Sequence, residues 1–231
     1  KMIADMESAV TEFINEMNAK LEKLKEINDG GKMLLDWVYE MTRNLLKEGK
    51  KVGLVGGDHS TPLGFIKALG EIHNDFAILQ IDAHADLRVA YEDFTYSHAS
   101  IMYNVLELVP QVTKLVQVGI RDYCDSELDI INQSKGRIHT FFDRDIKAQQ
   151  YEGATWKENC SQIVAALPQK IYISFDIDGL DPKLCPNTGT PVPGGFEAEQ
   201  IFYLFRMILG SGKQIIGFDL NEVSSGDHIG E

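Results

Sequence analysis

Cysteine is scarce in this sequence of 231 residues, which contains only three. Cys124, Cys160 and Cys185 lie far apart and form no C-x-x-C pair, so the sequence gives no sign of a disulfide framework. Long hydrophobic runs are also absent, and none approaches the roughly 20 residues that a membrane-spanning helix needs. No secretory signal is recognisable at the start of the sequence. We therefore expect a reduced, cytoplasmic protein.

Positive charge is in short supply as well. Lys and Arg together number 22, against 35 Asp and Glu, which gives a net charge of −13 at pH 7. Such an acidic chain is a poor partner for nucleic acids or anionic membranes and is compatible with a small cationic ligand. Taken alone, the acidity is equally explained by solubility.

The length allows one α/β domain with a sizeable core and leaves little room for a second. The first 48 residues or so predict a helical region. Apolar residues recur at helical spacing over residues 3–27, and the Asn-Asp-Gly-Gly stretch at residues 28–31 predicts the end of that helix. A second helix is predicted over residues 32–47, and Gly49 stops it.

From residue 52 onward, short apolar runs alternate with helical stretches. The runs that predict strands lie at residues 52–55, 77–81, 114–118, 137–142, 170–175 and 214–218. Helices are expected to begin near Pro62 and to occupy residues 99–108, 126–133, 154–167 and 197–209. This alternation predicts a single domain over residues 1–231, with a three-layer α/β/α fold and a mostly parallel sheet.

Acids and imidazoles follow four of the predicted strands. In open parallel sheets, ligands bind at the edge where the carboxyl ends of the strands meet. The side chains that follow these strands are His59, then Asp82, His84 and Asp86, then Asp176, Asp178 and Asp181, and finally Asp219 and Glu222. The alternate spacing of Asp82, His84 and Asp86 directs all three to one side if the extended conformation continues past Ile81.

The best-placed of these side chains predict a metal site. They are His59, Asp82, His84, Asp86, Asp176 and Asp178. Four carboxylates in one crevice repel one another unless cations compensate them, and two divalent ions bring the matching charge. An oxygen-rich set with two imidazoles suits Mn²⁺ better than Zn²⁺. Two such ions about 3.5–4 Å apart can activate a water near neutral pH, so the site is suited to hydrolysis.

Each motif also has a purely structural interpretation when it is taken alone. His59 follows a Gly-Gly turn, where a histidine is more often a turn or core residue than a metal ligand. The Asp-x-His-x-Asp stretch at residues 82–86 is compatible with a solvated loop, and residues 176–182 with a plain turn. Their joint occurrence at the ends of predicted strands favours the two-metal site.

Three motifs carry a family resemblance: Gly-Gly-Asp-His-Ser at residues 56–60, Asp-Ala-His-Ala-Asp at 82–86 and Ser-Phe-Asp-Ile-Asp-Gly-Leu-Asp-Pro at 174–182. Together they resemble the motifs of ureohydrolases of the arginase and agmatinase family, most of all microbial agmatinases. The similarity runs from about residue 45 to the C-terminus. It implies an arginase-like α/β domain in which a pair of Mn²⁺ ions hydrolyses a guanidinium group to urea.

The resemblance also implies roles for individual residues. One Mn²⁺ would be held by His59, Asp82, Asp86 and Asp176, and the other by Asp82, His84, Asp176 and Asp178. Asp86 would orient the attacking water as well. The proton-transfer histidine of the family matches His98, and its guanidinium-binding glutamate matches Glu222. A surface histidine in a loop is the alternative for His98.

The substrate is a finer question. Arginine-specific members resemble one another in an Asn two residues after the last Asp of the metal loop, and here that position is Arg88. The chain therefore looks more like an agmatinase, which forms putrescine for polyamine biosynthesis. The alternative function is that of a formimidoylglutamase, in which Arg88 would pair with the substrate carboxylates. Arg88 also has a purely structural interpretation, as an ion pair with Glu92 or Asp93. Asp122 is a candidate for the pocket mouth.

Two other classes of function stay open at this point. One is a non-catalytic family member that acts by binding, although retention of all six candidate ligands argues against it. The other is the related deacetylase fold with a single Zn²⁺, in which Asp86 and Asp178 would have no evident purpose.

Members of the family are commonly trimers or hexamers, so we expect a homo-oligomer. Elements that the family usually carries before the first strand and at the C-terminus are not recognisable in this sequence.

Overall fold

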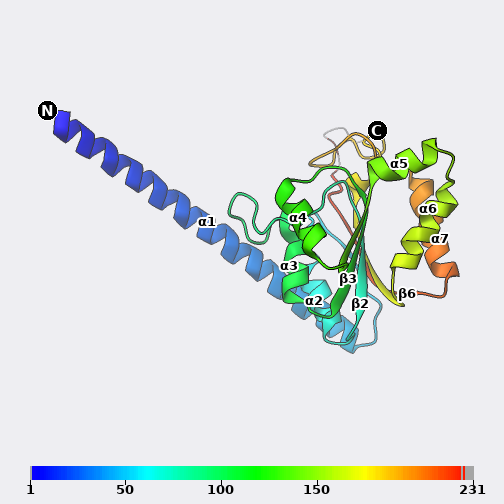
Figure 1. Ribbon diagram of the computed structural model, residues 1–231. Coiled ribbons are helices and arrows are strands. Elements are labelled where there is room, and N and C mark those ends of the chain that lie inside the picture. The colour runs from blue at the N-terminus through cyan, green and yellow to red at the C-terminus, as the bar shows by residue number, and fades with distance from the viewer. Residues whose placement is uncertain (1, 225, 227–231) are drawn as a thin grey trace.

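The predicted strands form one parallel sheet with helices packed on both faces (Figure 1). The computed structural model describes residues 2–224 and 226. The strands are β1 (Gly53–Val55), β2 (Phe76–Ile81), β3 (Val112–Ile120), β4 (Ile138–Phe142), β5 (Lys170–Asp176) and β6 (Gln214–Asn221). Their order in the sheet is β1-β6-β5-β2-β3-β4, and every neighbouring pair is parallel. The predicted fold class is confirmed.

The helices alternate with the strands along the chain. They are α1 (Met2–Lys47), α2 (Leu63–Gly70), α3 (Ile101–Leu108), α4 (Asp125–Gln133), α5 (Asp143–Tyr151), α6 (Trp156–Ala166) and α7 (Ala198–Gly210), with short 3₁₀ turns η1 (His98–Ser100) and η2 (Ile177–Gly179). Figure 1 shows α2, α3 and α4 on one face of the sheet and α6 and α7 on the other.

Each face of the sheet has its own hydrophobic core because successive strand residues point to opposite sides. Ile78 and Tyr172 belong to the core beneath α2 and α3. Leu79 and Ile173, their neighbours in sequence, belong to the core beneath α6 and α7. Burial on both faces explains why these strands read as continuous apolar runs rather than as an alternating pattern.

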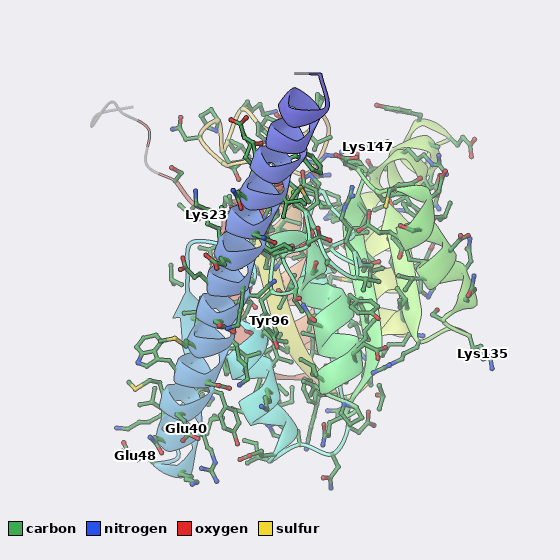
Figure 2. All side chains as sticks on the ribbon, turned by 90° about the vertical axis from the view of Figure 1, so that its left-hand side faces the viewer. Lys23, Glu40, Glu48, Tyr96, Lys135 and Lys147 are labelled. Carbon is green, nitrogen blue, oxygen red and sulfur yellow. The ribbon has the colours of Figure 1, made fainter. Side chains whose placement is uncertain are left out.

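The predicted break between two N-terminal helices was wrong, because α1 is one continuous helix over Met2–Lys47. The Asn-Asp-Gly-Gly stretch lies inside it and contacts the loop before η1. Asn28 donates to the carbonyl of Asp93 (3.1 Å) and accepts from the amide of Thr95 (2.8 Å). A Cβ atom on Gly31 would lie 2.9 Å from that of Tyr96, a residue that Figure 2 shows beside α1. The glycine therefore permits close packing here and does not end the helix.

Helix α5 was not predicted at all. It is strongly polar, and only Asp143 and Ile146 are buried among its nine residues. A helix with so few buried apolar positions leaves no periodic signal in the sequence. Among the described residues, no helix combines the length and the hydrophobicity needed to cross a membrane.

Candidate metal centre

Three buried side chains surround the imidazole of His59 at the carboxyl edge of the sheet. Its Nδ1 atom lies 3.2 Å from Asp82 Oδ2, 3.0 Å from Asp86 Oδ2 and 3.3 Å from Asp176 Oδ2. His59 follows β1, the two aspartates follow β2, and Asp176 ends β5. Because β1 and β2 are not neighbours in the sheet, only the folded chain brings these residues together.

A second cluster forms around His84. Its Nδ1 atom lies 2.9 Å from Asp178 Oδ2 and 3.6 Å from Asp82 Oδ1. Asp82 is therefore shared: its Oδ2 atom faces His59 and its Oδ1 atom faces His84. The ligand atoms of His59, Asp82 and Asp86, and those of Asp82, His84 and Asp178, lie within 4.8 Å of one another in each group, a spacing that a metal ion can bridge.

All six predicted side chains thus meet at one site, although not for the expected reason. The extended conformation ends at Ile81, and Asp86 has a φ of +55° in the loop that follows. The loop, and not a continued strand, turns Asp86 toward His59. Asp176 lies on the His59 side, where its Oδ1 atom accepts the amide of Asp178 (2.9 Å). The expectation that Asp176 bridges both ions stays a prediction.

Hydrogen bonds behind His59 define which of its nitrogens faces the carboxylates. Ser174 donates its hydroxyl to Asp219 Oδ1 (3.1 Å), so its oxygen is left to accept from His59 Nε2 (2.9 Å). In the neutral imidazole, Nδ1 then carries a lone pair and no proton. It is buried, has no hydrogen-bond partner in the part of the chain that the structure describes, and points at three carboxylate oxygens. That arrangement is repulsive unless a proton or a metal ion lies between these atoms.

The electrostatics of the cluster show how strongly it attracts cations. Burial opposes the charged form of each histidine, yet Asp178 and Asp82 raise the pKa of His84 to about 11, and the carboxylates around His59 raise its pKa well above the usual value. Burial and the charge of Asp82 raise the pKa of Asp86 to about 7. The same field that holds protons on the imidazoles also stabilises divalent cations.

The donor set fits a pair of divalent ions. Four carboxylates, those of Asp82, Asp86, Asp176 and Asp178, are balanced by two such charges. Asp178 Oδ2 is also buried and has no hydrogen-bond partner among the described residues, while its Oδ1 atom accepts the amide of Ala83 (3.0 Å). An oxygen donor that faces the cluster with its lone pairs free is what a metal ligand requires.

A small cavity of about 130 Å³ opens beside the second cluster. Its lining includes His84, Asp86, Arg88, Tyr91, His98 and Asp122.

His98 begins η1, and its Nδ1 atom lies 3.4 Å from Asp58 Oδ2. The hydrogen bond to Asp58 raises the pKa of His98. Although burial opposes it, the same contact with His98 lowers the pKa of Asp58 to about 2.

Glu222 lies just beyond β6 in a left-handed backbone conformation, with a φ of +60°. Its amide donates to the carbonyl of Gly57 (2.7 Å), and its Oε1 atom accepts the amide of His59 (2.8 Å). Burial raises the pKa of Glu222, and the amide of His59 opposes that shift. These contacts tie Glu222 to the loop that carries His59, and no hydrogen bond of its Oε2 atom is seen among the described residues.

Arg88 does not pair with Glu92 or Asp93, as the structural alternative supposed. Its Nε atom lies 3.9 Å from Glu127 Oε2, and its guanidinium lies over the ring of Tyr91, 5.2 Å from the centroid. Asp122 stands at the cavity with its side chain 64% exposed, 3.7 Å from His84 Nε2. Asp122 thus lines this cavity, and its role at the mouth of a substrate pocket stays a prediction.

Several residues at the site were not identified from the sequence. Ser174 lies inside a quoted motif and Asp58 inside another, yet neither was given a role. Glu127 is buried and accepts hydrogen bonds from the amides of Leu87 (2.9 Å) and Cys124 (2.9 Å). These bonds join the loop after β2 to the start of α4. For Ser174, the available signal was its position as a polar residue within the mostly apolar strand β5. Asp181, by contrast, bonds to Lys183 and takes no part in the two clusters.

Comparison with known proteins agrees with this geometry. Residues 4–228 match the family model described as "Arginase family". The N(1)-aminopropylagmatine ureohydrolase of Thermus thermophilus is 37% identical over 186 residues, which cover 78% of this chain and 57% of that protein. The chain thus spans little more than half the length of this relative.

Solved structures show the same fold. The agmatine ureohydrolase of Thermoplasma volcanium superposes with a TM-score of 0.69 at 26% identity, covering 84% of this chain and 61% of the other. Proclavaminate amidino hydrolase from Streptomyces clavuligerus gives a TM-score of 0.71 at 27% identity, with 85% and 63% covered. Because nearly all residues of this chain match the family model, the chain belongs to the arginase family.

Proposed function

We propose that this protein is a dimanganese hydrolase that cleaves a guanidinium group to urea and an amine, with agmatine as substrate and putrescine as the amine product. The observation that carries the proposal is the buried Nδ1 atom of His59, which faces three carboxylate oxygens at 3.0–3.3 Å and has no hydrogen-bond partner among the described residues. An oxygen-rich set with two imidazoles suits Mn²⁺. When bound, the two ions would lower the pKa of a water and polarise the substrate.

The chain's own residues would divide the remaining work. Asp86 would accept a hydrogen bond from the attacking water and orient it toward the guanidinium carbon. The Oε2 atom of Glu222 would pair with the guanidinium, whose planar donors match a carboxylate. As the carbon–nitrogen bond to the amine breaks, His98 would donate a proton to the departing nitrogen, and the raised pKa of His98 favours the protonated form that this step needs.

The surroundings of the cavity favour a cationic tail on the substrate. Arg88 is occupied by Glu127 and Tyr91, which makes it a poor partner for the carboxylates of formimidoylglutamate. The exposed carboxylate of Asp122 suits an ammonium group instead. This argument supports agmatine, and it also supports a second candidate, N(1)-aminopropylagmatine, named for the relative from Thermus thermophilus.

The test is a urea-release assay of the Mn²⁺-loaded protein with agmatine, N(1)-aminopropylagmatine, arginine and guanidinobutyrate. Formimidoylglutamate is assayed in parallel for formamide. We expect urea from one or both of the first two compounds and loss of that activity in Asp176→Ala. Formamide release, or preference for arginine, would contradict the substrate assignment. The absence of any product from a chain that binds Mn²⁺ would contradict the proposed hydrolysis.

A further inference from the structure

A row of polar side chains, buried except for the half-buried Thr140 at its end, crosses the sheet one level below the candidate metal centre. Its members are Thr140 on β4, Gln117 on β3, Gln80 on β2, Ser174 on β5 and Asp219 on β6. They are in register from strand to strand: Thr140 pairs with Gln117, Gln117 with Gln80, Gln80 with Ser174, and Ser174 with Asp219. In-register residues of parallel strands point to the same face, so the row forms one continuous layer.

The two glutamines of this row lie where an unpaired amide would destabilise the fold. Gln80 and Gln117 are both fully buried in strands whose other residues are almost all apolar. A buried amide destabilises the fold unless all its hydrogen-bonding groups are paired. Each amide NH₂ group has two acceptors here, and each carbonyl has a donor. Because all of these groups are paired, each of the two amides is held in a single orientation.

Fixed backbone acceptors set the direction of those hydrogen bonds. Gln117 Nε2 donates to the carbonyl of Ala85 (2.8 Å), and Gln80 Nε2 donates to the carbonyl of His84 (3.2 Å). Because a carbonyl cannot donate, neither amide can be reversed. Thr140 therefore donates to Gln117 Oε1 (2.7 Å), and Gln117 donates to Gln80 Oε1 (2.7 Å). The side-chain hydrogen bonds of the row therefore all run in one direction, from Thr140 through Gln117 to Gln80.

That direction ends at the carboxylate shared by the two clusters. Gln80 Nε2 donates to Asp82 Oδ2 (2.8 Å), while the amide of His84 donates to Asp82 Oδ1 (2.7 Å). Each oxygen of Asp82 thus has one protein donor and faces one cluster with its remaining lone pair. Hydrogen bonds that run in one direction polarise and strengthen one another.

We propose that Gln80 and Gln117, with Thr140 behind them, are positioning residues that hold Asp82 in the orientation in which its two oxygens face two metal ions. The inference rests on the proposed function, since it concerns the same metal centre. Ser174 and Asp219 serve His59 in the same way from the other half of the row. The sheet register, and not a surface loop, then defines the geometry of the metal pair.

The test compares metal binding in variants along the row. Gln80→Leu removes the donor to Asp82, Gln117→Leu removes the support of Gln80, and Thr140→Val removes the outermost donor. Loss of a group that orients a metal ligand typically weakens metal binding about 10- to 100-fold. We expect a loss of that size for Gln80→Leu and progressively smaller losses for the other two, measured by Mn²⁺ titration calorimetry.

Val116→Ala provides the matched control. Val116 is buried next to Gln117 in β3, but it points into the opposite core, so its truncation destabilises the fold without touching Asp82. We expect Val116→Ala to bind Mn²⁺ as the wild type does. Electron paramagnetic resonance of the bound ions adds a spectroscopic readout: Gln80→Leu should alter the spin-coupled Mn²⁺ signal, and Val116→Ala should not. Circular dichroism and thermal unfolding verify that each metal-free variant is folded.

Two outcomes in the variants would overturn the inference. One is a folded Gln80→Leu variant that binds two Mn²⁺ ions with wild-type affinity and spectrum. The other is an equal loss of affinity in Val116→Ala, which would show that any damage to the sheet has the same effect. A wild-type chain that binds Mn²⁺ but hydrolyses no guanidine would contradict the proposed function alone, because the ranking of affinities does not depend on turnover. A wild-type chain that binds no Mn²⁺ would contradict both.

Discussion

The floor of the site and its mouth are built differently. The floor consists of the six side chains of the two clusters, and five of them are almost completely buried, with only His84 partly exposed. The mouth consists of Asp58, Arg88, His98 and Asp122, whose side chains are between 39% and 64% exposed. Strand ends and in-register hydrogen bonds hold the floor, whereas loops hold the mouth.

This difference separates two tasks. A metal pair needs ligands in a fixed geometry, which a rigid parallel sheet supplies at its carboxyl edge. Recognition of a particular guanidine needs only a few charges at the entrance, which loops can supply in different arrangements. Substitutions in the floor should therefore abolish the reaction, and substitutions in the mouth should change its rate, its pH dependence or its substrate preference.

Asp178→Asn in the floor should have the largest effect. The change keeps the size of the side chain and an acceptor for the amide of Ala83, but it removes the charge that faces His84. We expect loss of one Mn²⁺ and a fall in kcat of at least about 10³-fold, because each ion contributes several kcal/mol to the transition state. Metal analysis and urea release measure both. Full activity in this variant would show that Asp178 is not a ligand.

Glu222→Gln, between floor and mouth, should have an intermediate effect. Glutamine keeps an acceptor for the amide of His59 but loses the charge that would pair with the guanidinium. We expect kcat/KM to fall roughly 10- to 100-fold, the range for a hydrogen bond to a charged group. Mn²⁺ content should stay at the wild-type level. A loss of metal together with activity would assign Glu222 to the floor instead.

Asp58→Asn should change the pH profile. The hydrogen bond to Asp58 raises the pKa of His98, so the wild-type histidine stays protonated to higher pH. Removing the charge lowers that pKa toward its usual value. If His98 donates the proton to the amine, the fall in activity on the alkaline side should then begin at a lower pH. A profile of kcat against pH with an unmoved alkaline limb would contradict this role of His98.

Asp122→Asn should have the smallest effect. An exposed carboxylate contributes about 0–1 kcal/mol to a pair with a cation. We therefore expect KM for agmatine to rise by a factor of about five or less, with kcat unchanged. Guanidinobutyrate, whose tail is anionic, serves as the control, since its binding should not weaken. An equal rise in KM for both compounds would argue against recognition of a cationic tail.

Much of the floor was predictable from the sequence, because its residues directly follow apolar runs that form buried strands. The strands at Phe76–Ile81 and Lys170–Asp176 illustrate this: their composition predicts them, and their acids follow. What was missed depends on contacts between distant residues. Gly31 reads as a helix end until Tyr96 is known to pack against it. The role of Gln80 is invisible until the register with β3 is known.

The mouth was less predictable for the same reason. His98 was identified from a motif and Asp122 from its place after a predicted strand, but their partners come from other loops: Asp58 from the loop after β1 for His98, and His84 from the loop after β2 for Asp122. Arg88 had three acids within reach in sequence or space, and the structure places it against Glu127 rather than Glu92 or Asp93. Short-range sequence patterns carry no information about which of several nearby charges a long side chain contacts.

The most direct test of the account is the number and kind of metal ions that the wild-type chain holds. The purified protein is loaded with Mn²⁺, freed of excess metal by gel filtration and measured by mass spectrometry against its protein concentration. The account predicts close to two Mn²⁺ ions per chain. One Zn²⁺ per chain, retained in preference to Mn²⁺, or no bound metal at all would contradict it.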